Sequence, residues 1–425
     1  MMKENYILYS NLQKKYPVFH FDRYDFYYSD FHLVIQYFFH SEEHYFSPKM
    51  NIKFGTYLKN QLSDDLLKGF IFNIGMIELI SYWKSVGSPI IKIHPFQLDS
   101  EQESWWRKLY YKGLGEFFYQ NGIKVSPSDF IQFKYDDQAP HYQTLLFPKV
   151  ENLQQVIVPI GGGKDSVVTL EHYRKTNSII PFIINPRGAT LECARIAGFD
   201  SFDHIFIIDR QIDPHLLKMN EDGFLNGHTP FSAMLAFYTA LVGYITNTRT
   251  IALSNESSAN EVTIPGTDVN HQYSKSEEFE KDFQYYVERY MNSCVDYFSY
   301  LRPYSELQIA EMFAQYTPYH SVFKSCNAGS KQNIWCCNCS KCLFAFTILS
   351  PFISHEKLVT IFGEDLFNKP ELLNYFEELT GIADQKPFEC VGTIDEVNEA
   401  IQMVMNQLDD KFLIQKYKEH LTRKK

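Results

Sequence analysis

The sequence lacks the features that would direct a protein to a membrane or to nucleic acid. Within 425 residues, no uninterrupted apolar run approaches the ~20 residues that span a bilayer. The first 17 residues have neither the apolar core nor the cleavage pattern of a signal peptide. The formal net charge is −11, and the only concentrated basic run is at residues 423–425. We therefore expect a cytoplasmic protein with no membrane or nucleic-acid partner.

Internal repeats and low-complexity tracts are also absent, so the chain reads as an ordinary globular protein. Its length exceeds one typical core, because domains usually have about 100 to 200 residues. Changes in composition and hydrophobic periodicity along the sequence predict three parts. Residues 1–150 form an α+β domain that is a candidate for substrate binding, residues 151–350 a nucleotide-binding domain, and residues 351–425 a helical region.

Cysteines are few and unevenly placed, since five of the eight lie between positions 326 and 342. This spacing is poor for a disulfide framework but common for a metal site in a reducing compartment. Cys326, Cys336, Cys339 and Cys342 follow the pattern C-x9-C-x2-C-x2-C, and Cys337 is spare. Four thiolates suit a closed, structural zinc site. An iron–sulfur cluster and reduced thiols without metal are the alternatives.

Hydrophobic periodicity predicts the elements of the first part. The β-branched and aromatic residues at 31–39 favour a strand. Residues 70–86 and 100–122 have the three- and four-residue spacing of helices, and Ser100 with Glu103 suggests a capping box.

From residue 154 onward, short apolar strands alternate with helices. We expect strands at 156–160, 179–185, 204–209 and 250–254. The intervening helices begin near Asp165 or Ser166, run over 189–199, where Gly198 is the C-cap, and start at Thr229 with Pro230 at the first position. This alternation predicts a doubly wound parallel sheet. Beyond Leu349 the chain is expected to be helical, ending on an amphipathic segment at 393–408.

A glycine loop follows the first of these strands, at the sheet edge where parallel α/β proteins bind ligands. Its residues are Gly161, Gly162, Gly163, Lys164, Asp165 and Ser166. Glycines let backbone amides approach a phosphate, and the helix that follows points its positive end at the anion. Lys164 adds a charge, Ser166 a hydroxyl, and Asp165 a carboxylate suited to Mg²⁺.

The loop could also be a simple tight turn, but the ordered set is more specific than a glycine pair. It resembles the SGGxDS loop of the PP-loop ATP pyrophosphatases, with Gly161 where that family usually has serine. The resemblance implies cleavage of ATP between its α- and β-phosphates. The Walker pattern and the dinucleotide fingerprint do not fit. The cysteine spacing is similar to the zinc knot of 7-cyano-7-deazaguanine synthases, which are also PP-loop enzymes.

A long polar segment at 254–283 leaves the fourth strand next to the glycine loop. We expect it to line the active site. Lys275 could neutralise phosphates, and Glu256 or Glu261 could serve metal or acid–base chemistry. A solvated surface loop is the alternative. His228, in the preceding junction, is a weaker candidate that reads as a capping or packing residue.

Taken together, several motifs resemble one family over residues 19–393. They are GMIELISYW, VPIGGGKDSVVTLE, LNGHTPFSA, SNESSANE, VNHQYSKSEEFE, WCCNCSKCLF and KPFECVGT. The family is MurL, the UDP-N-acetyl-α-D-muramoyl-L-alanyl-L-glutamate epimerases. The resemblance implies that ATP and Mg²⁺ activate the α-carboxylate of the terminal L-glutamate of the UDP-MurNAc-dipeptide. The α-carbon then inverts, and the product enters peptidoglycan precursor synthesis.

Inversion needs a base and a proton donor, which the sequence does not single out. Glu78 lies among apolar residues, where a carboxylate could hold a proton near neutral pH. Cys390 and His271 are the other candidates. The alternatives are a solvent-facing Glu78, a buried structural Cys390, and a His271 that contacts phosphate or uridine.

Two other functions fit parts of the sequence. One is a different PP-loop adenylating enzyme, similar to the deazaguanine synthases or to tRNA-modifying enzymes. A tRNA enzyme should carry a basic face, which the charge balance does not favour. The other is a non-catalytic nucleotide-binding protein, which would not need the charged groups of the 254–283 segment.

Overall fold

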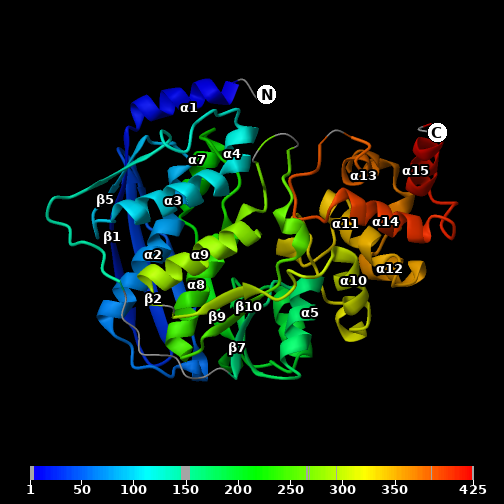
Figure 1. The fold of residues 1–425 in the computed structure, drawn as a ribbon, viewed down its shortest axis with the longest axis horizontal. Coiled ribbons are helices and arrows are strands. Elements are labelled where there is room, and N and C mark those ends of the chain that lie inside the picture. The colour runs from blue at the N-terminus through cyan, green and yellow to red at the C-terminus, as the bar shows by residue number, and fades with distance from the viewer. Residues whose placement is uncertain are drawn as a thin grey trace. The chain divides into compact units, whose positions relative to one another are not determined.

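The computed structural model describes residues 4–144, 154–264, 267, 269–292, 294–383 and 385–423. Internal contacts divide the chain into two compact units. Unit 1 contains Met1–Ile157, Ser201–Ile251 and Gln272–Tyr297, and unit 2 contains Val158–Asp200, Ala252–His271 and Phe298–Lys425. Segments of the two units alternate along the chain. The domain boundaries expected near residues 150 and 350 stay predictions. The fold is α/β, with a large mixed sheet and many helices (Figure 1).

Unit 1 is built around strands in the order β6-β5-β1-β2-β4-β9, with β3 paired to β2. β5 and β6 run parallel to β1, whereas β1, β2, β4 and β9 pair antiparallel. Alternation of buried aromatic and more exposed residues along β1 and β2 gives their shared sheet one apolar face. The strands are β1 Val18–Tyr28, β2 His32–Ser41, β3 His44–Phe46, β4 Lys49–Lys53, β5 Ile90–Ile93, β6 Gln132–Tyr135 and β9 Phe206–Gln211.

Helix α2 (Asp64–Trp83) covers that apolar face and packs against β1, β2 and α8 (Figure 1). Gly75 allows the close approach, because a Cβ there would lie 2.5 Å from the Phe21 ring. Among the described helices, α2 alone is long and apolar enough to cross a membrane, but 89% of its apolar window is buried, as in a core helix. The other helices of unit 1 are α1 Glu4–Lys15, α3 Ser100–Gly113, α4 Gly115–Gln120, α7 Pro214–Glu221, α8 Phe231–Thr246 and α9 Glu277–Tyr290.

Unit 2 combines strand β8 (Ser178–Ile184) with the helices of the C-terminal part. The chain passes between the units within β7 (Gln155–Pro159), β10 (Thr250–Leu253) and β11 (Asp296–Ser299). Figure 1 shows α10 to α14 grouped in yellow and orange, and α11 packs against α10, α12, α13 and α14. The helices of unit 2 are α5 Lys164–Tyr173, α6 Gly188–Ile196, α10 Glu306–Ala314, α11 Ser340–Leu349, α12 His355–Phe362, α13 Leu373–Thr380, α14 Ile394–Val404 and α15 Phe412–Arg423.

The strands predicted from residue 154 onward are confirmed as β7, β8, β9 and β10, and β10 is parallel to β7. The predicted parallel sheet is confirmed only in part, because β9 pairs antiparallel with β4 from the N-terminal part. β9 begins at Phe206, two residues late, since His204 ends a short 3₁₀ helix (Phe202–His204).

Several predicted element ends also need correction. α3 is capped by Asp99 and Gln102 in a capping box, and Ser100 is already its first helical residue. α8 begins at Phe231 with Pro230 at the N-cap, so Thr229 is not the cap. The polar 254–283 segment ends earlier than predicted, because α9 begins at Glu277 and is capped by Ser276. Residues 265, 266 and 268 of that segment lie outside the described residues.

The capping assignment predicts the effect of a substitution at the start of α3. Asp99→Ala should lower the stability of unit 1 by about 1 to 2 kcal/mol, because its carboxylate accepts from the Gln102 amide. Ser100→Ala should cost a few tenths of a kcal/mol at most. Urea unfolding followed by tryptophan fluorescence measures both, since Trp105 and Trp106 lie on α3. Equal losses in the two variants would contradict the assignment.

Candidate active site and cysteine cluster

The glycine loop joins β7 to α5 and lies within unit 2. Gly162 has a φ of +82°, and a Cβ there would lie 3.0 Å from the backbone of Ala189, so glycine is needed at this position. Gly163 is the N-cap of α5, where no side chain caps the helix. The first amides of α5 and the helix dipole therefore form a site that suits a phosphate.

Lys164 is buried directly after the glycines, where it forms ion pairs with Asp165 and Glu306. Burial by itself would lower the pKa of Lys164, but the two carboxylates outweigh it and raise that pKa. The lysine is therefore charged. Glu306 is the first residue of α10, and its backbone amide donates to Oε1 of Glu396 at 2.8 Å.

Glu306 is a candidate site residue that the sequence reasoning missed. Burial raises its pKa to about 8; Lys164 opposes this rise, and the charges of Asp165 and Glu256 add to it. Glu256 is itself buried, and the Asp165 side chain is 32% exposed. Asp165 and Glu306 thus share one lysine, and Glu256 is close enough to Glu306 to raise its pKa, an arrangement that a divalent cation would stabilise. The sequence signal at Glu306 was only a helix-capping pattern, Ser305 with Gln308.

The C-terminal motif KPFECVGT packs next to this cluster. Lys386 forms an ion pair with Glu261, and its Nζ also donates to the carbonyl of Gly392 at 3.0 Å. A Cβ on Gly392 would lie 3.0 Å from Cγ of Glu306. The motif therefore lies against the carboxylate that holds Lys164, within the same unit.

Two of the predicted acid–base residues, His271 and Cys390, come from segments that meet here. The His271 and Phe388 ring centroids are 6.4 Å apart. Cys390 is half-buried and follows Glu389, whose Oε2 accepts from Asn327 at 2.7 Å. Burial raises the pKa of Glu389, with His271 among the charges that oppose the rise. Glu389 is a second candidate that the sequence reasoning missed.

The remaining predicted residues belong to unit 1. Glu78 is fully buried and accepts from Nε and Nη2 of Arg210, each at 2.8 Å, which gives it the character of a structural ion pair. Lys275 ends the 3₁₀ helix Tyr273–Lys275 and is half-buried. Nδ1 of His228 lies 3.6 Å from Oε2 of Glu116.

The four predicted metal ligands come together in unit 2. The sulfurs of Cys326, Cys336, Cys339 and Cys342 all lie within 4.8 Å of one another, and the Cys336 and Cys342 sulfurs are 3.8 Å apart. Tetrahedral zinc with bonds of ~2.3 Å places its sulfurs about 3.8 Å apart, so these residues fit the ion. Cys337 is excluded, because its thiol donates to the Phe362 carbonyl at 3.1 Å.

Cys339 also positions the helix that follows the cluster. Its sulfur is the N-cap of α11 and accepts from the Cys342 amide at 3.4 Å. Hydrogen bonds from Cys342 lower the pKa of Cys339 to about 5, so this sulfur is a thiolate near neutral pH. A thiolate is the form that binds zinc. All eight cysteines of the chain are free.

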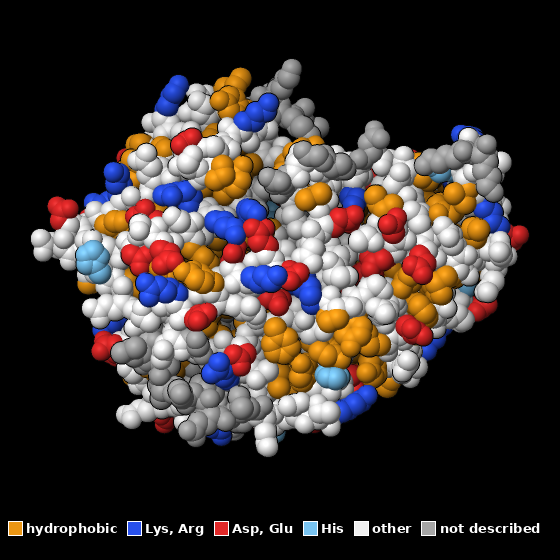
Figure 2. Space-filling model, in the orientation of Figure 1, with side chains coloured by type: hydrophobic (Ala, Val, Ile, Leu, Met, Phe, Trp, Pro, Cys, Tyr) orange, Lys and Arg blue, Asp and Glu red, His pale blue; other side chains and the backbone are white. Residues whose placement is uncertain are grey.

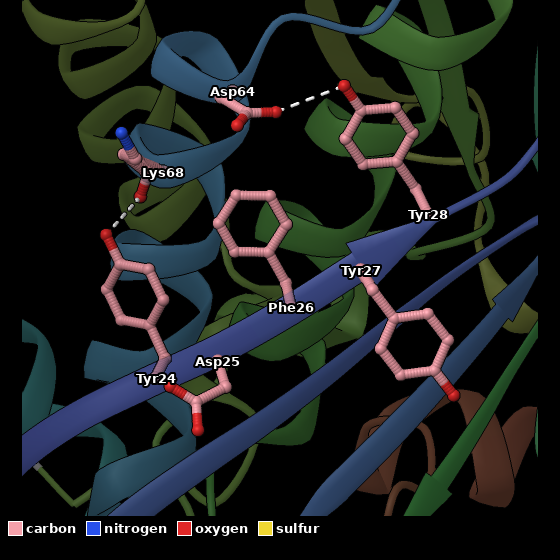
Figure 3. Close-up of a pocket in the computed structure, with 7 residues that line it drawn as sticks. All are labelled: Tyr24, Asp25, Phe26, Tyr27, Tyr28, Asp64 and Lys68. Atoms are coloured by element: carbon pink, nitrogen blue, oxygen red, sulfur yellow. Dashed lines mark hydrogen bonds between the residues drawn. The ribbon is translucent and has the colours of Figure 1, made fainter.

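A shallow pocket of about 390 Å³ lies in unit 1 (Figure 3). It is lined by residues 24–28 of β1 with Asp64 and Lys68 of α2. Tyr28 donates to Asp64 at 3.0 Å, and Tyr24 to the Lys68 carbonyl at 3.2 Å. None of the sequence-predicted site residues lines this pocket.

The surface over α3 and α9 in unit 1 carries both signs of charge. Lys108 lies 3.0 Å from Glu278 and 2.6 Å from Asp282, and Lys112 lies 2.6 Å from Glu278. Figure 2 shows blue and red side chains interspersed on this face. The basic side chains Lys108 and Lys112 of this surface are thus paired with carboxylates.

Comparison with known families accounts for nearly the whole chain. The model of the MurL N-terminal domain matches residues 10–300, and that of the MurL C-terminal domain matches residues 322–425. This chain belongs to the MurL family. The resemblance seen in the sequence motifs is therefore confirmed.

Curated relatives of this MurL chain carry one name, UDP-N-acetyl-alpha-D-muramoyl-L-alanyl-L-glutamate epimerase. The protein from Xanthomonas oryzae pv. oryzae is 34% identical over 79% of this chain and 74% of its own length. Those from Salinispora tropica and a Micromonospora species are each 32% identical over 77% of this chain, and over 71% and 73% of their own lengths. No solved structure is significantly similar to the chain.

The geometry of the cysteine cluster predicts opposite outcomes for two neighbouring cysteines. Cys339→Ser should remove about one zinc equivalent per chain and lower the melting temperature, because it deletes one of four ligands while a serine can still cap α11. Cys337→Ser should keep the zinc. Metal analysis by mass spectrometry of the purified chains checks this, and zinc loss from Cys337→Ser alone would overturn the ligand assignment.

Proposed function

We propose that this MurL chain inverts the terminal L-glutamate of UDP-N-acetylmuramoyl-L-alanyl-L-glutamate in an ATP-dependent reaction. The curated relatives supply the reaction and the substrate by name. The observation in the structure that carries the proposal is the uncapped start of α5 beside the Lys164, Asp165 and Glu306 cluster. That combination suits a nucleoside triphosphate with its metal ion.

The glycine loop is the proposed ATP site, as in the PP-loop superfamily that it resembles. Backbone amides at Gly163 and the start of α5 would contact the phosphates. Ser166 donates to the Gly163 carbonyl at 2.9 Å, which keeps its hydroxyl at the loop. Lys275 was expected from the sequence to bind the β- and γ-phosphates, and that role stays a prediction because Lys275 belongs to unit 1 and the glycine loop to unit 2.

Asp165, Glu256 and Glu306 are the proposed Mg²⁺ ligands, since oxygen donors at a partly open site suit this ion. Magnesium would neutralise charge on the departing pyrophosphate. Glu306 would give up its proton as the cation binds, because a nearby positive charge lowers a carboxyl pKa.

Adenylation explains why an epimerase would use ATP. The α-proton beside a carboxylate is barely acidic, because its removal would place two negative charges on the enediolate. In the proposed first step, a carboxylate oxygen attacks the α-phosphorus of ATP, and pyrophosphate leaves. The acyl adenylate carries no carboxylate charge, so a base removes the α-proton more easily. Reprotonation on the opposite face and hydrolysis then release AMP and the D-glutamate product.

The acid–base groups are proposed from the segment that packs against Glu306. Cys390 and His271 are the candidates from the sequence, and Glu389 joins them because burial raises its pKa. Glu78 is the weaker candidate, since Arg210 occupies both of its oxygens. The cysteine cluster is proposed as a structural zinc site, and residues 1–150 as the part that binds the muramoyl peptide.

The other functions considered from the sequence have less support. A deazaguanine synthase or a tRNA-modifying enzyme would share the loop and the cysteine cluster, but both MurL domain models match this chain. A non-catalytic nucleotide-binding protein would not need Glu256 and Glu306 buried beside the phosphate loop.

The reaction predicts inverted and labelled glutamate in heavy water. The purified chain is incubated with UDP-MurNAc-L-Ala-L-Glu, ATP and Mg²⁺ in D₂O, and the glutamate is then hydrolysed off and examined by chiral chromatography and mass spectrometry. We expect D-glutamate with deuterium at Cα, together with AMP and pyrophosphate. Pyrophosphate without inversion would refute the epimerase activity but keep the ATP site.

Asp165→Asn is the matched variant for this assay. It should lower pyrophosphate release by at least about 10²-fold, since it removes a charge from the proposed metal site while keeping the side-chain shape. The variant should remain folded, although its melting temperature should fall because Lys164 loses one of its two charged partners. Normal turnover would remove the metal role assigned to Asp165.

The raised pKa of Glu306 predicts a pH-dependent stability. In the folded state the pKa of Glu306 is about 8, whereas its ordinary value is 4.5, so between these two values the folded chain keeps a proton that the unfolded chain has lost. The free energy of unfolding therefore falls as the pH rises from 4.5 to about 8. Glu306→Gln lacks this loss, because the amide does not ionise. Melting temperatures are measured without Mg²⁺ and ATP. The melting temperature of Glu306→Gln minus that of the parent should increase from pH 5 to pH 8.

Glu311→Gln, an exposed position of the same helix α10, is the control for this measurement and should follow the parent at every pH. Parallel pH profiles for Glu306→Gln and the parent would show that the Glu306 carboxyl does not titrate in this window.

A further inference from the structure

A cluster of imidazole and carboxylate groups lies in unit 1, on strands that contribute none of the proposed ATP, acid–base or cysteine-cluster residues. It consists of His20, Asp22, His40 and His94, called here the histidine cluster. β1 and β2 pair so that His20 lies opposite His40, while their neighbours Phe19, Phe21 and Phe39 are buried on the other face. Strand alternation therefore places both histidines on the more exposed face of the sheet.

A β-bulge adds the carboxylate to this face. The register of β1 and β2 shifts between Phe21 and Arg23, so Asp22 has no partner on β2. Bulges redirect a side chain and recur beside functional sites. Oδ2 of Asp22 lies 2.7 Å from Nδ1 of His40, and its Oδ1 lies 3.9 Å from Nε2 of His94.

His94 follows β5 and brings a third imidazole to the same point. Its Nε2 lies 3.0 Å from Nδ1 of His20, and its Nδ1 lies 2.5 Å from Oδ2 of Asp136. A histidine held by a carboxylate on one nitrogen, with the other aimed at a shared centre, is the usual arrangement around a metal ligand. Lys92 is the nearby cation, and its Nζ pairs with Asp136 at 2.7 Å.

The distances and access suit a metal ion. One ligand atom from each of His20, Asp22 and His40 lies within 4.8 Å of the other two. Tetrahedral bonds of ~2.0 Å would place ligand atoms about 3.3 Å apart, so small side-chain rotations close the site. The side chains of Asp22, His40 and His94 are 24 to 30% exposed, which leaves a path for an ion.

Packing of the rings also suits coordination. The His20 and His40 rings stack with centroids 4.2 Å apart, which holds both rings in place.

We propose that the histidine cluster binds a divalent first-row transition-metal ion, with Zn²⁺ as the probe ion. Imidazole nitrogens with one carboxylate form a donor set that such ions prefer and that Mg²⁺ does not. The bound ion links β1 to β2, and His94 at the end of β5 supports the site through its contact with His20. This site is separate from the cysteine cluster, which has only sulfur donors and lies in unit 2.

Cobalt separates the two sites by their spectra. Co²⁺ bound to thiolates gives intense charge-transfer absorption, whereas Co²⁺ on nitrogen and oxygen ligands gives only weak visible bands. The full-length Cys339→Ser chain is titrated with Co²⁺ and then with Zn²⁺. We expect one equivalent with the weak bands, displaced by one equivalent of Zn²⁺ and accompanied by a higher melting temperature.

Variants in the same Cys339→Ser background identify the ligands. The His20→Ala/His40→Ala double variant should bind no metal at this site, and Asp22→Asn should bind at least about tenfold more weakly. His32→Ala, which removes another histidine of β2, is the control and should bind one equivalent. A melting temperature measured without metal confirms that each variant is folded.

Three results would overturn the proposal. They are no weak-band equivalent in the Cys339→Ser chain, an equivalent that survives in the folded double histidine variant, or equal losses in the double variant and in His32→Ala. Any of them would leave the cluster as a hydrogen-bonded network of the sheet surface. Failure of the epimerase assay would not affect this site, because no residue of the cluster belongs to the proposed ATP or acid–base groups.

Discussion

The buried charge of Lys164 is the constraint on which the candidate active site depends. An ammonium group inside a protein is costly unless carboxylates surround it, and here Asp165 and Glu306 do so. Glu306 is fixed in turn through the backbone amide that donates to Glu396, and it leaves no room for a side chain at residue 392. One charge thus connects the glycine loop, the start of α10 and the C-terminal motif.

The parts of the site that were predictable from the sequence are those encoded by neighbouring residues. The glycine loop was recognisable because a buried strand, three glycines and a helix start follow one another within about a dozen positions. The cysteine ligands were recognisable because three of the four lie within seven residues. In both cases the chemistry and the spacing appear in one short segment.

Glu306 and Glu389 were missed because their surroundings come from distant segments. Nothing near Glu306 in the sequence indicates that it will face a lysine 142 positions away. The histidine cluster has the same origin, since only strand pairing brings residues 20, 22, 40 and 94 together. The predicted starts of α3 and α9 differ from the observed ones for a local reason. Asp99 and Ser276 compete with neighbouring residues for the same capping role. The mixed sheet arose from β4, whose pairing with β9 no local pattern encodes.

The long sequence separation between Lys164 and Glu306 has a consequence for the synthesis of the protein. A ribosome releases the glycine loop well before it makes α10, and the residue 392 segment follows later still. During that interval Lys164 lacks one of its two carboxylate partners, and loop closure over such a span is slow. The proposed phosphate site should therefore be completed only after α10 and the residue 392 segment have been made, so its assembly must wait for segments far from the glycine loop in the sequence.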